Sequence, residues 1–295
     1  MGGNLTIPYY PGCTLNTYAK HFDDSARESA ELLGFTMDEL TEWNCCGAAF
    51  PLTPDNIMGL TAPTKVLANA RKEGDTVMTL CSVCYNVLKR TNKVVADDRE
   101  KRETIESFIE EKYDGSINVV HYLEVLRDTI GFDKVKENVE RPLQKIKMGA
   151  YYGCMLLRPF EDMGIDDHEA PTIIEDLFKA LGAEPVDFPN KIECCGAHLA
   201  AGGKDGDDVV KQLSGCVMRS AVGSGVEAIV TSCPLCQYNL EQSQEKLVKE
   251  VSGYKAVPIV YFTQVLGLAL GQCEDTLGLD ENKWDIRPLL KERGV

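Results

Sequence analysis

The sequence lacks any long hydrophobic run, and no stretch approaches the roughly 18 consecutive apolar residues that a membrane-spanning helix requires. Its N-terminal segment, MGGNLTIPYYPGC, also lacks the basic region and the apolar core of a secretory signal. We therefore expect no membrane insertion and a cytoplasmic protein. Because thiols stay reduced there, we expect the twelve cysteines to be metal ligands or redox groups rather than disulfides.

Basic residues are also scarce, since 31 Lys and Arg stand against 46 Asp and Glu and the formal net charge is −15. Nucleic-acid-binding proteins cluster Lys and Arg, so this balance argues against nucleic acid as a partner. It does not exclude a small anionic ligand, because a few basic side chains in a pocket act locally at physiological salt.

Familiar electron-relay motifs are absent as well. The sequence has no ferredoxin-type C-x-x-C-x-x-C run and no evident flavin or nicotinamide fingerprint. If the cysteines carry out redox chemistry, the electrons must therefore come from a partner protein.

Ten of the twelve cysteines form one five-cysteine pattern that occurs twice: a single cysteine, a Cys-Cys-Gly and a C-x-x-C. In the first copy the gaps between these blocks are 31 and 34 residues, and in the second they are 39 and 37. Two equal sets of thiols indicate two thiolate-built sites. The first set is Cys13, Cys45, Cys46, Cys81 and Cys84, and the second set is Cys154, Cys194, Cys195, Cys233 and Cys236.

Other segments repeat in register with the cysteines. The offset between copies is 141 at the first cysteine, 149 at the pair, 152 at the C-x-x-C and 140 at the blocks beginning with Val120 and Val260. Four landmarks in one order at a nearly constant offset indicate tandem duplication. We predict one domain over residues 1–140 and another over 141–295, with a charged linker near Lys134–Lys147, each large enough to bury its own core.

Short apolar runs alternate with helical stretches in both halves, which predicts parallel strands covered by helices. The expected fold class is α/β, a tandem duplication of two Rossmann-like parallel-sheet domains. The predicted strands are Ile7–Tyr10, Val77–Leu80, Asn118–His121, Met148–Tyr152, Ala228–Thr231 and Pro258–Phe262, and the predicted helices are Ser25–Gly34, Asp55–Lys72, Asp97–Tyr113, Thr172–Gly182 and Asp208–Gly223.

Each cysteine block lies where a strand gives way to a loop or to the start of a helix. Ligands of open α/β sheets bind at that carboxyl edge, where backbone N–H groups lower thiol pKa values. We therefore expect the two sets of cysteine loops to face a shared cleft.

The cysteine pattern narrows the chemistry of these sites. A thioredoxin-type dithiol leaves three cysteines of each set unexplained, and zinc takes four ligands at compact spacings. Five thiols with an adjacent pair suit a larger thiolate-held iron–sulfur cluster, which we favour over zinc and over inert buried thiols. Gly47 and Gly196 would let the backbone approach such a cluster closely.

At these residues the sequence resembles the cysteine-rich CCG-domain family, and within it the B subunits of the heterodisulfide reductases of methanogens. The resemblance covers essentially the whole chain, with the complete motif in both halves. It implies two non-cubane 4Fe-4S clusters. The cluster ligands would be Cys13, Cys45, Cys46, Cys81 and Cys84 for one cluster and Cys154, Cys194, Cys195, Cys233 and Cys236 for the other.

The resemblance also implies an activity and partners. In that family the heterodisulfide of coenzyme M and coenzyme B lies between the clusters and is split into two thiols, which would make this chain a catalytic oxidoreductase subunit. The implied partners are a ferredoxin-like C subunit, a flavin-containing A subunit and an associated hydrogenase or formate dehydrogenase. Other relatives serve organic-acid oxidation, fumarate reduction and sulfur oxidation, several with incomplete motifs. The complete motifs here favour the disulfide-reducing branch.

The implied substrate carries a sulfonate on one side and a phosphate on the other, so its anchors should lie where the halves differ. Arg158, His198 and Lys204 follow second-set cysteines and have Thr17, Ala49 and Asp55 as their counterparts in the first half. Arg158 and Lys204 are candidates to bind the substrate, with a surface salt bridge as the alternative. His198 is a candidate proton donor, with a loop cap or a hydrogen bond to sulfur as the alternative.

Lys20 and His21, shortly after Cys13, are weaker anchor candidates, and we expect them to face solvent instead. We predict that His121 is packed at a strand end and that Cys216 and Cys273 are buried free thiols.

Two other functions stay open on the sequence alone. One is an electron-transfer subunit of another respiratory or sulfur-metabolism complex, with clusters that touch no substrate. The other is a zinc-stabilised interaction module. Iron and acid-labile sulfide assays separate the zinc module from the two redox functions.

Overall fold

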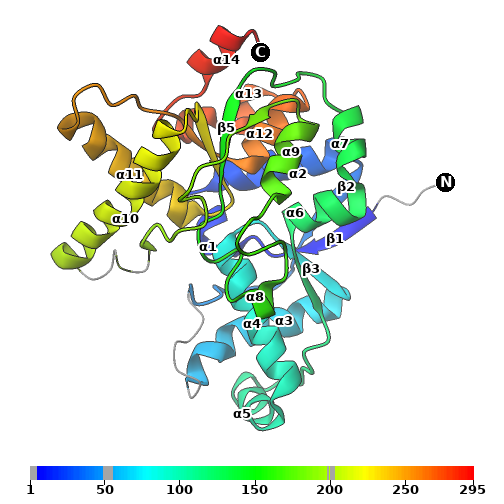
Figure 1. The fold of residues 1–295 in the computed structure, drawn as a ribbon. Coiled ribbons are helices and arrows are strands. Elements are labelled where there is room, and N and C mark those ends of the chain that lie inside the picture. Colours follow the sequence, from blue (N-terminus) through cyan, green and yellow to red (C-terminus); the bar gives the residue numbers. More distant parts are fainter. Residues whose placement is uncertain (1–4, 49–55, 198, 200–202) are drawn as a thin grey trace.

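The computed structural model describes residues 5–48, 56–197, 199 and 203–295. Within this part of the chain the polypeptide forms two four-stranded parallel sheets, one in each half (Figure 1). The strand orders are β2-β1-β3-β4 and β6-β5-β7-β8, so the two sheets share one topology. The predicted duplicated α/β fold is confirmed, whereas the domain boundary after residue 140 stays a prediction.

The first sheet has a central strand, β3, whose apolar and β-branched residues suit burial on both faces. Its strands are β1 (Leu5–Tyr9), β2 (Phe35–Glu39), β3 (Thr76–Thr79) and β4 (Asn118–His121). Its helices are α1 (Gly12–Leu15), α2 (Lys20–Leu32), α3 (Met58–Glu73), α4 (Ser82–Asp97), α5 (Arg99–Ile109), α6 (Tyr122–Glu124), the π-helix η1 (Val125–Ile130) and α7 (Phe132–Glu137).

The second sheet repeats this plan around β7, whose four residues are all buried. Its strands are β5 (Lys147–Tyr151), β6 (Glu184–Pro185), β7 (Ala228–Thr231) and β8 (Ile259–Tyr261). Its helices are α8 (Phe160–Met163), α9 (Ile173–Ala180), α10 (Gly203–Gly223), α11 (Pro234–Glu250), α12 (Phe262–Ala269), α13 (Glu274–Leu277), the 3₁₀ helix η3 (Leu279–Glu281) and α14 (Arg287–Arg293).

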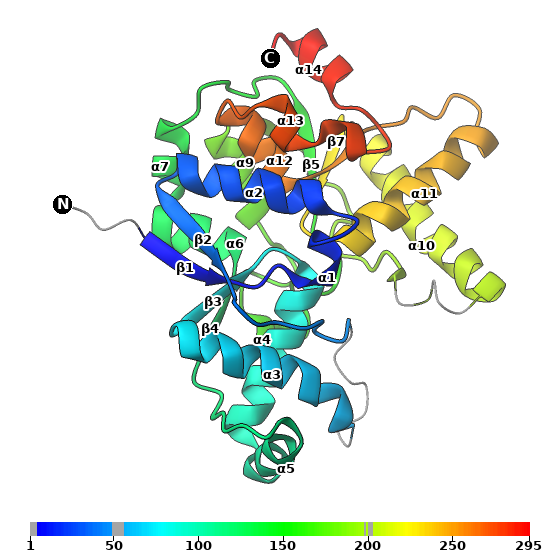
Figure 2. The same ribbon diagram turned by 180° about the vertical axis from the view of Figure 1, so that it is seen from behind.

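The two halves interlock through α2 of the first and α12 of the second, which lie side by side (Figure 2). Helix α2 buries Phe22, which stacks on Tyr261 with ring centroids 4.1 Å apart. The hydroxyls of Ser25 and Thr263 are 2.7 Å apart, and the Gln272 amide donates to the Ser25 carbonyl over 3.0 Å. These buried polar bonds fix how one sheet stands relative to the other.

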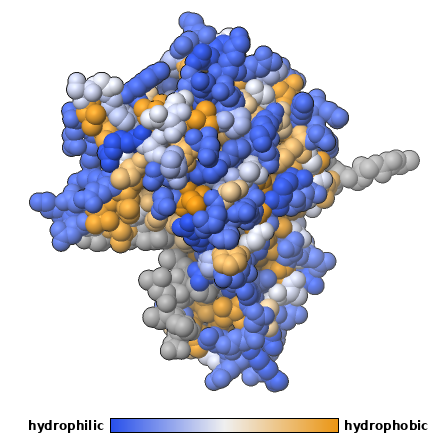
Figure 3. All heavy atoms as spheres, viewed as in Figure 1, coloured by the Kyte–Doolittle hydropathy of each residue, from blue (hydrophilic) through white to orange (hydrophobic). Residues whose placement is uncertain are grey.

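The outer surface is mainly hydrophilic on the face of Figure 3, although apolar side chains gather along the α10–α11 pair. Val209 and Leu213 of α10 are exposed there. No helix in the described residues is both long and apolar enough to cross a membrane.

Candidate metal centres

The first thiol set is assembled at the carboxyl ends of three neighbouring strands. Cys13 lies on α1 after β1, and the pair Cys45-Cys46 lies on the loop after β2. Cys81 is the N-cap of α4 after β3, and Cys84 lies in the first turn of that helix. Parallel strands end at one edge of a sheet, so residues distant in sequence converge there.

The thiols of this set lie in pairs at contact distance. The Sγ atoms of Cys13 and Cys45 are 3.6 Å apart, as are those of Cys46 and Cys84. Gly12 has φ +75°, and a Cβ there would lie 2.8 Å from the Cys84 Sγ. Glycine at this position therefore leaves room for the sulfur atoms.

The second set repeats this geometry closely. The Sγ atoms of Cys154 and Cys194 are 3.6 Å apart, and those of Cys195 and Cys236 are 3.4 Å apart. In both sets the glycine of Cys-Cys-Gly donates its backbone N–H to the first sulfur of the pair, at 3.4 Å in the first set and 3.2 Å in the second. The duplication thus extends from the sequence to individual hydrogen bonds.

The two sets differ in exposure. Cys13 and Cys45 are exposed, whereas their counterparts Cys154 and Cys194 are half-buried. The other six thiols, those of Cys46, Cys81, Cys84, Cys195, Cys233 and Cys236, are buried, and none of the twelve cysteines, all of them described, is in a disulfide.

A buried tyrosine beneath each set holds its Cys-Cys loop. The Tyr10 hydroxyl donates to the carbonyl of Asn44 over 2.9 Å, and the equivalent Tyr151 hydroxyl donates to Glu193 over 2.7 Å. Asn44 and Glu193 each come directly before the cysteine pair. Burial, followed by the negative charge of the nearby thiolates, raises the pKa of both tyrosines, so each hydroxyl keeps its proton and remains a donor.

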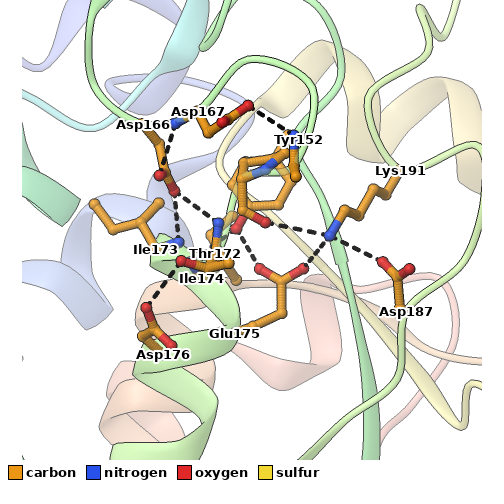
Figure 4. Close-up of polar contacts among 12 residues, drawn as sticks. Tyr152, Asp166, Asp167, Thr172, Ile173, Ile174, Glu175, Asp176, Asp187 and Lys191 are labelled. Carbon is orange, nitrogen blue, oxygen red and sulfur yellow. Dashed lines mark hydrogen bonds and ion pairs between the residues drawn. The ribbon is translucent and has the colours of Figure 1, made fainter.

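A polar network holds the second loop on its other side (Figure 4). Lys191 lies three residues before Cys194 and pairs with Glu175 at 2.8 Å and with Asp187 at 2.9 Å. The Tyr152 hydroxyl donates to Glu175, and the Tyr152 backbone N–H donates to the Lys191 carbonyl over 2.9 Å. The carboxylate of Glu175 therefore ties the end of β5 to the loop that carries the pair.

The two sets meet at the N-termini of α4 and α11. Cys81 is the N-cap residue of α4 and Cys233 is the N-cap residue of α11, and the two thiols are close enough to shift each other's pKa. Ser82 and Ser232 reinforce this junction, with hydroxyl oxygens 2.7 Å apart and the Ser82 N–H donating to the Ser232 carbonyl over 3.2 Å. The two thiol sets are thus neighbours and do not lie on opposite sides of the molecule.

The electrostatics at this junction favour a thiolate. Hydrogen bonds from the Cys233 thiol and then the Cys84 thiol, with the first backbone N–H groups of α4, hold the pKa of Cys81 well below its ordinary value. Hydrogen bonding to Cys84 is also the main cause that lowers the pKa of Cys46. Cys81 and Cys46 are therefore the thiols of this set that most readily become thiolates, the form that binds metals, whereas hydrogen bonding to the same two residues raises the pKa of Cys84.

His121 has the structural role expected of it. It ends β4, is fully buried, and its Nε2 lies 2.7 Å from the carbonyl of Leu80, directly before Cys81. Its Nδ1 accepts the N–H of Leu123 over 3.2 Å. Burial lowers the pKa of His121 to about 4, so the ring is neutral and supports the C-x-x-C loop.

Asn86, which the sequence did not single out, joins the halves. It lies two residues after Cys84, and its amide donates to the carbonyls of Met155 and Arg158 over 2.8 and 2.7 Å. The equivalent Asn239 instead donates to the Cys195 carbonyl over 3.3 Å, within its own half. The repeated Cys-x-Asn and Cys-x-x-Asn endings offered a signal, but only the fold reveals the different partners.

The predicted substrate residues are only partly located. Arg158 is half-buried on the loop after Cys154, Lys204 is exposed at the start of α10, and neither forms an ion pair with a described residue. His198 lies outside the described residues. The roles of all three stay predictions.

Three other expectations are wrong. His21 is 7% exposed rather than solvent-facing, because Tyr261 of the second half packs against its ring at 5.2 Å. Cys216 and Cys273 are exposed rather than buried, because Cys216 lies on the outer face of α10 and Cys273 on the loop before α13. Lys20 is exposed as expected.

The comparison with family models is decisive at this point, because the model of the cysteine-rich domain named CCG matches residues 7–89 and 148–241, one copy per half. The chain belongs to the CCG cysteine-rich domain family. Its matched regions contain all ten repeated cysteines. CCG-family membership, with the relatives below, supports an iron–sulfur, electron-transferring subunit of an oxidoreductase complex.

Several curated relatives of this CCG-family chain are similar over most of its length. The 8-methylmenaquinol:fumarate reductase membrane anchor subunit of Wolinella succinogenes is 34% identical, over 95% of this chain and 98% of the relative. The B subunit of the ferredoxin:CoB-CoM heterodisulfide reductase of Methanosarcina mazei is 30% identical, over 75% and 74%. The B subunit of a heterodisulfide reductase of Methanosarcina acetivorans is 27% identical over 94% and 93%.

Among solved structures, a hypothetical protein from Helicobacter pylori matches with a TM-score of 0.74 at 14% sequence identity. The match covers 96% of this chain and 53% of that one, so the CCG-family chain spans about half the length of the solved protein. This likeness supports the fold alone.

The donor set fits an iron–sulfur group better than a single ion. Within the described residues no three His, Cys, Asp or Glu side chains are grouped as the ligands of one metal ion would be. Yet five thiols, mostly buried and with glycines beside them, converge in each half. Five sulfur donors exceed the four that zinc takes and are typical of thiolate-held clusters.

Proposed function

We propose that the chain is the catalytic subunit that reduces the heterodisulfide of coenzyme M and coenzyme B to two thiols, with two non-cubane 4Fe-4S clusters. The observation that carries the proposal is the junction of α4 and α11, where Ser82 and Ser232, the residues next to Cys81 and Cys233, have hydroxyl oxygens 2.7 Å apart and so make the two thiol sets neighbours. Two relatives named as B subunits of heterodisulfide reductases, at 30% and 27% identity, support this substrate.

Each thiol set would hold one cluster, and a bound cluster supplies one electron and an iron site for sulfur. Cleavage of a disulfide takes two electrons, so neighbouring twin sites suit a substrate that becomes two thiols. The tyrosines beneath the sets keep the Cys-Cys loops in position, and the glycines leave room for the group. The proposed ligands are Cys13, Cys45, Cys46, Cys81 and Cys84 in the first half and Cys154, Cys194, Cys195, Cys233 and Cys236 in the second.

The proposed substrate is asymmetric, so its anchors are expected at residues where the two halves differ. Arg158 lies on the loop that follows Cys154, and the Asn86 amide binds that loop through the Arg158 carbonyl. We assign the guanidinium of Arg158 to one anionic group of the substrate and the ammonium of Lys204 to the other. His198 would donate a proton to a departing thiolate.

The assignment as a heterodisulfide reductase subunit also implies partner subunits that supply electrons. A ferredoxin-like C subunit and a flavin-containing A subunit, with an associated hydrogenase or formate dehydrogenase, would deliver the electrons. The exposed first set, with Cys13 and Cys45 at the surface, supports electron entry through the first half.

The test uses anaerobically purified protein and electron paramagnetic resonance. Addition of the heterodisulfide should change the cluster signal of the wild-type protein, and Cys13→Ser with Cys45→Ser should abolish disulfide reduction. Full activity of this double variant, after loss of the first cluster, would refute the two-cluster mechanism. Arg158→Lys, which keeps the charge but not the planar fork, should weaken substrate binding about tenfold.

A second function is favoured by one observation, the 34% identity to the fumarate reductase subunit over nearly both full lengths. In this alternative the chain passes electrons from a quinol to a partner reductase and does not cleave a disulfide. This alternative would be favoured if the paramagnetic resonance signal of the clusters does not change when the heterodisulfide is added but disappears when fumarate and the partner subunits are added.

A further inference from the structure

Two threonines have the same position in the two halves and share an uncommon property. Thr79 ends β3 two residues before Cys81, and Thr231 ends β7 two residues before Cys233. Both residues are 0% exposed, and neither hydroxyl has a hydrogen-bond partner among the described residues. A buried hydroxyl without a partner is destabilising, and most buried polar groups in folded proteins are hydrogen-bonded. We take the recurrence in both halves as evidence of a common role.

The strand backbone offers these hydroxyls no local acceptor. In a helix a buried threonine can donate to the carbonyl four residues earlier, as Thr64 of α3 does to Leu60 over 2.7 Å. In an extended strand that carbonyl is far away, and the strand carbonyls point within the sheet toward the neighbouring strands. The acceptor must therefore come from another part of the site.

The neighbouring strands bring both threonines beside the tyrosines that lie beneath the thiol sets. Thr231 pairs with Tyr151 in the register of β5 and β7. In the first sheet the pairing of β1 with β3 brings Tyr10 beside Thr79 in the same way. Side chains of paired residues project from the same face of a sheet, so each threonine side chain shares a face with a tyrosine ring.

The tyrosine rings in turn lie beside sulfur. In the first half, a Cβ built on Gly12 would lie 2.8 Å from the Cys84 Sγ and 3.5 Å from the Tyr10 ring. In the second half, the corresponding distances from Gly153 are 3.2 Å to sulfur and 3.7 Å to the tyrosine ring. Because the threonines neighbour these rings and precede each C-x-x-C by two residues, they lie at the base of the two thiol sets.

We propose that Thr79 and Thr231 each donate a hydrogen bond to a sulfur atom of the iron–sulfur cluster bound in their half. The presence of a cluster in each thiol set is taken from the proposed function, whereas its disulfide chemistry is not needed. A hydrogen bond to sulfur stabilises the more negative, reduced form of a cluster and so raises its reduction potential. The two threonines therefore make both clusters easier to reduce.

The test is a redox titration of the anaerobically purified protein, followed by the paramagnetic resonance of its clusters. Thr79→Val nearly keeps the shape of the side chain but removes the hydroxyl, so it should lower the midpoint potential of the first-half cluster. Thr231→Val should lower that of the second-half cluster, and the double variant should lower both. We expect a two- to tenfold shift of each one-electron equilibrium, which corresponds to about 20 to 60 mV.

The chain contains a closely matched control. Thr91 of α4 is also 0% exposed with an unpartnered hydroxyl in the described part of the chain, but it lies seven residues beyond Cys84, about 10 Å along the helix. Its counterpart in the repeat is Ser243 rather than a second threonine. Thr91→Val should leave both potentials unchanged. Thr79→Ser and Thr231→Ser keep the hydroxyl and should have potentials close to those of wild type.

Exchangeable protons provide a second measurement. Electron–nuclear double resonance in ordinary water and in heavy water detects protons that are hydrogen-bonded to cluster sulfur. One exchangeable coupling should disappear in each valine variant and remain in each serine variant. Iron and sulfide contents are measured on every preparation to establish that the clusters are present.

Potentials of the two valine variants equal to those of Thr91→Val would overturn the proposal. Equal shifts in the serine and valine variants would also overturn it, because they would indicate that the threonines act through packing alone. The heterodisulfide-dependent change of the cluster signal is measured on the same preparations. Its absence, together with lowered potentials in the valine variants, would contradict the disulfide chemistry alone.

Discussion

At the scale of single residues, the clearest feature that both halves share is the hydrogen bond from a buried tyrosine hydroxyl to each Cys-Cys loop. Tyr10 and Tyr151 make the same bond to the residue before the cysteine pair, although their halves have diverged in most other side chains. We therefore regard these bonds as supports of the Cys-Cys loops.

Tyr10→Phe and Tyr151→Phe should each lower the free energy of unfolding by about 1 kcal/mol, because a part-buried carbonyl loses its donor. Each should also lower the iron content of its own half. Urea unfolding and iron analysis measure both effects. Tyr18→Phe, at an exposed ring, is the matched control, and a Tyr10→Phe variant indistinguishable from it would contradict this role.

His121 gives a prediction about pH. Its pKa is about 4 in the folded protein against 6.5 for an ordinary histidine, so the unfolded chain binds a proton that the folded chain does not. Its contribution to stability is therefore complete above about pH 6.5 and is lost as the pH falls toward 4, by at most about 3 kcal/mol.

His121→Phe removes this dependence together with two hydrogen bonds. At pH 7.5 the variant should be less stable than wild type by about 2 kcal/mol, and the difference should shrink or reverse by pH 4.5. Urea unfolding at several pH values measures this difference. A constant difference across that range would mean that the ring is not held neutral by burial.

Sequence reasoning at this scale identified the cysteines but misjudged side chains whose neighbours come from the other half. His21 follows Cys13 closely and looked solvent-facing, but Tyr261 covers it. The local pattern contains no information about that contact, since 240 residues separate the two side chains.

At the scale of elements, helices α4 and α11 are the important pair, because each begins at a C-x-x-C and their N-termini meet. Asn86 of α4 extends this junction to the loop of residues 155–158, whereas its counterpart Asn239 stays within its own half.

Asn86→Ala should therefore lower the free energy of unfolding by about 2 kcal/mol, because two part-buried carbonyls lose their donor. Asn239→Ala, the matched control in the repeat, should cost about 1 kcal/mol. Chemical denaturation measures both. Equal costs would indicate that the contact between the halves contributes little.

The six predicted strands and the five predicted helices followed from the alternation of apolar runs and amphipathic stretches, whereas the long helices α4 and α11 were not predicted. Strands β4 and β7 have the predicted bounds, and α9 lies within its predicted range. Strands β2 and β6 were not predicted, because Phe35–Glu39 ends in two acidic residues and Glu184–Pro185 has only two residues. Their places at sheet edges come from pairing with β1 and β5, which no local pattern reveals.

At the scale of the whole molecule, two copies of one sheet bring their carboxyl edges together. The interlocked helices α2 and α12 fix this arrangement, and the contact between Cys81 and Cys233 is its chemical consequence. A substitution in one thiol set should therefore change the paramagnetic resonance spectrum of the cluster in the other set.

Cys233→Ser tests this coupling. The cluster of the first half should remain, and its paramagnetic resonance spectrum should shift because its neighbour at Cys81 has changed. Cys154→Ser, at a thiol that pairs with Cys194, should change that spectrum less. Equal shifts of the first-half spectrum in the two variants would contradict direct coupling through Cys81.

The central claim is that each thiol set holds its own iron centre and that the two centres are neighbours. X-ray anomalous scattering at the iron edge, from crystals grown without oxygen, tests it most directly. The account predicts two separate iron peaks, one within each five-cysteine set and on either side of the Cys81–Cys233 contact. Anomalous peaks at the zinc edge instead, or iron in only one set, would contradict it.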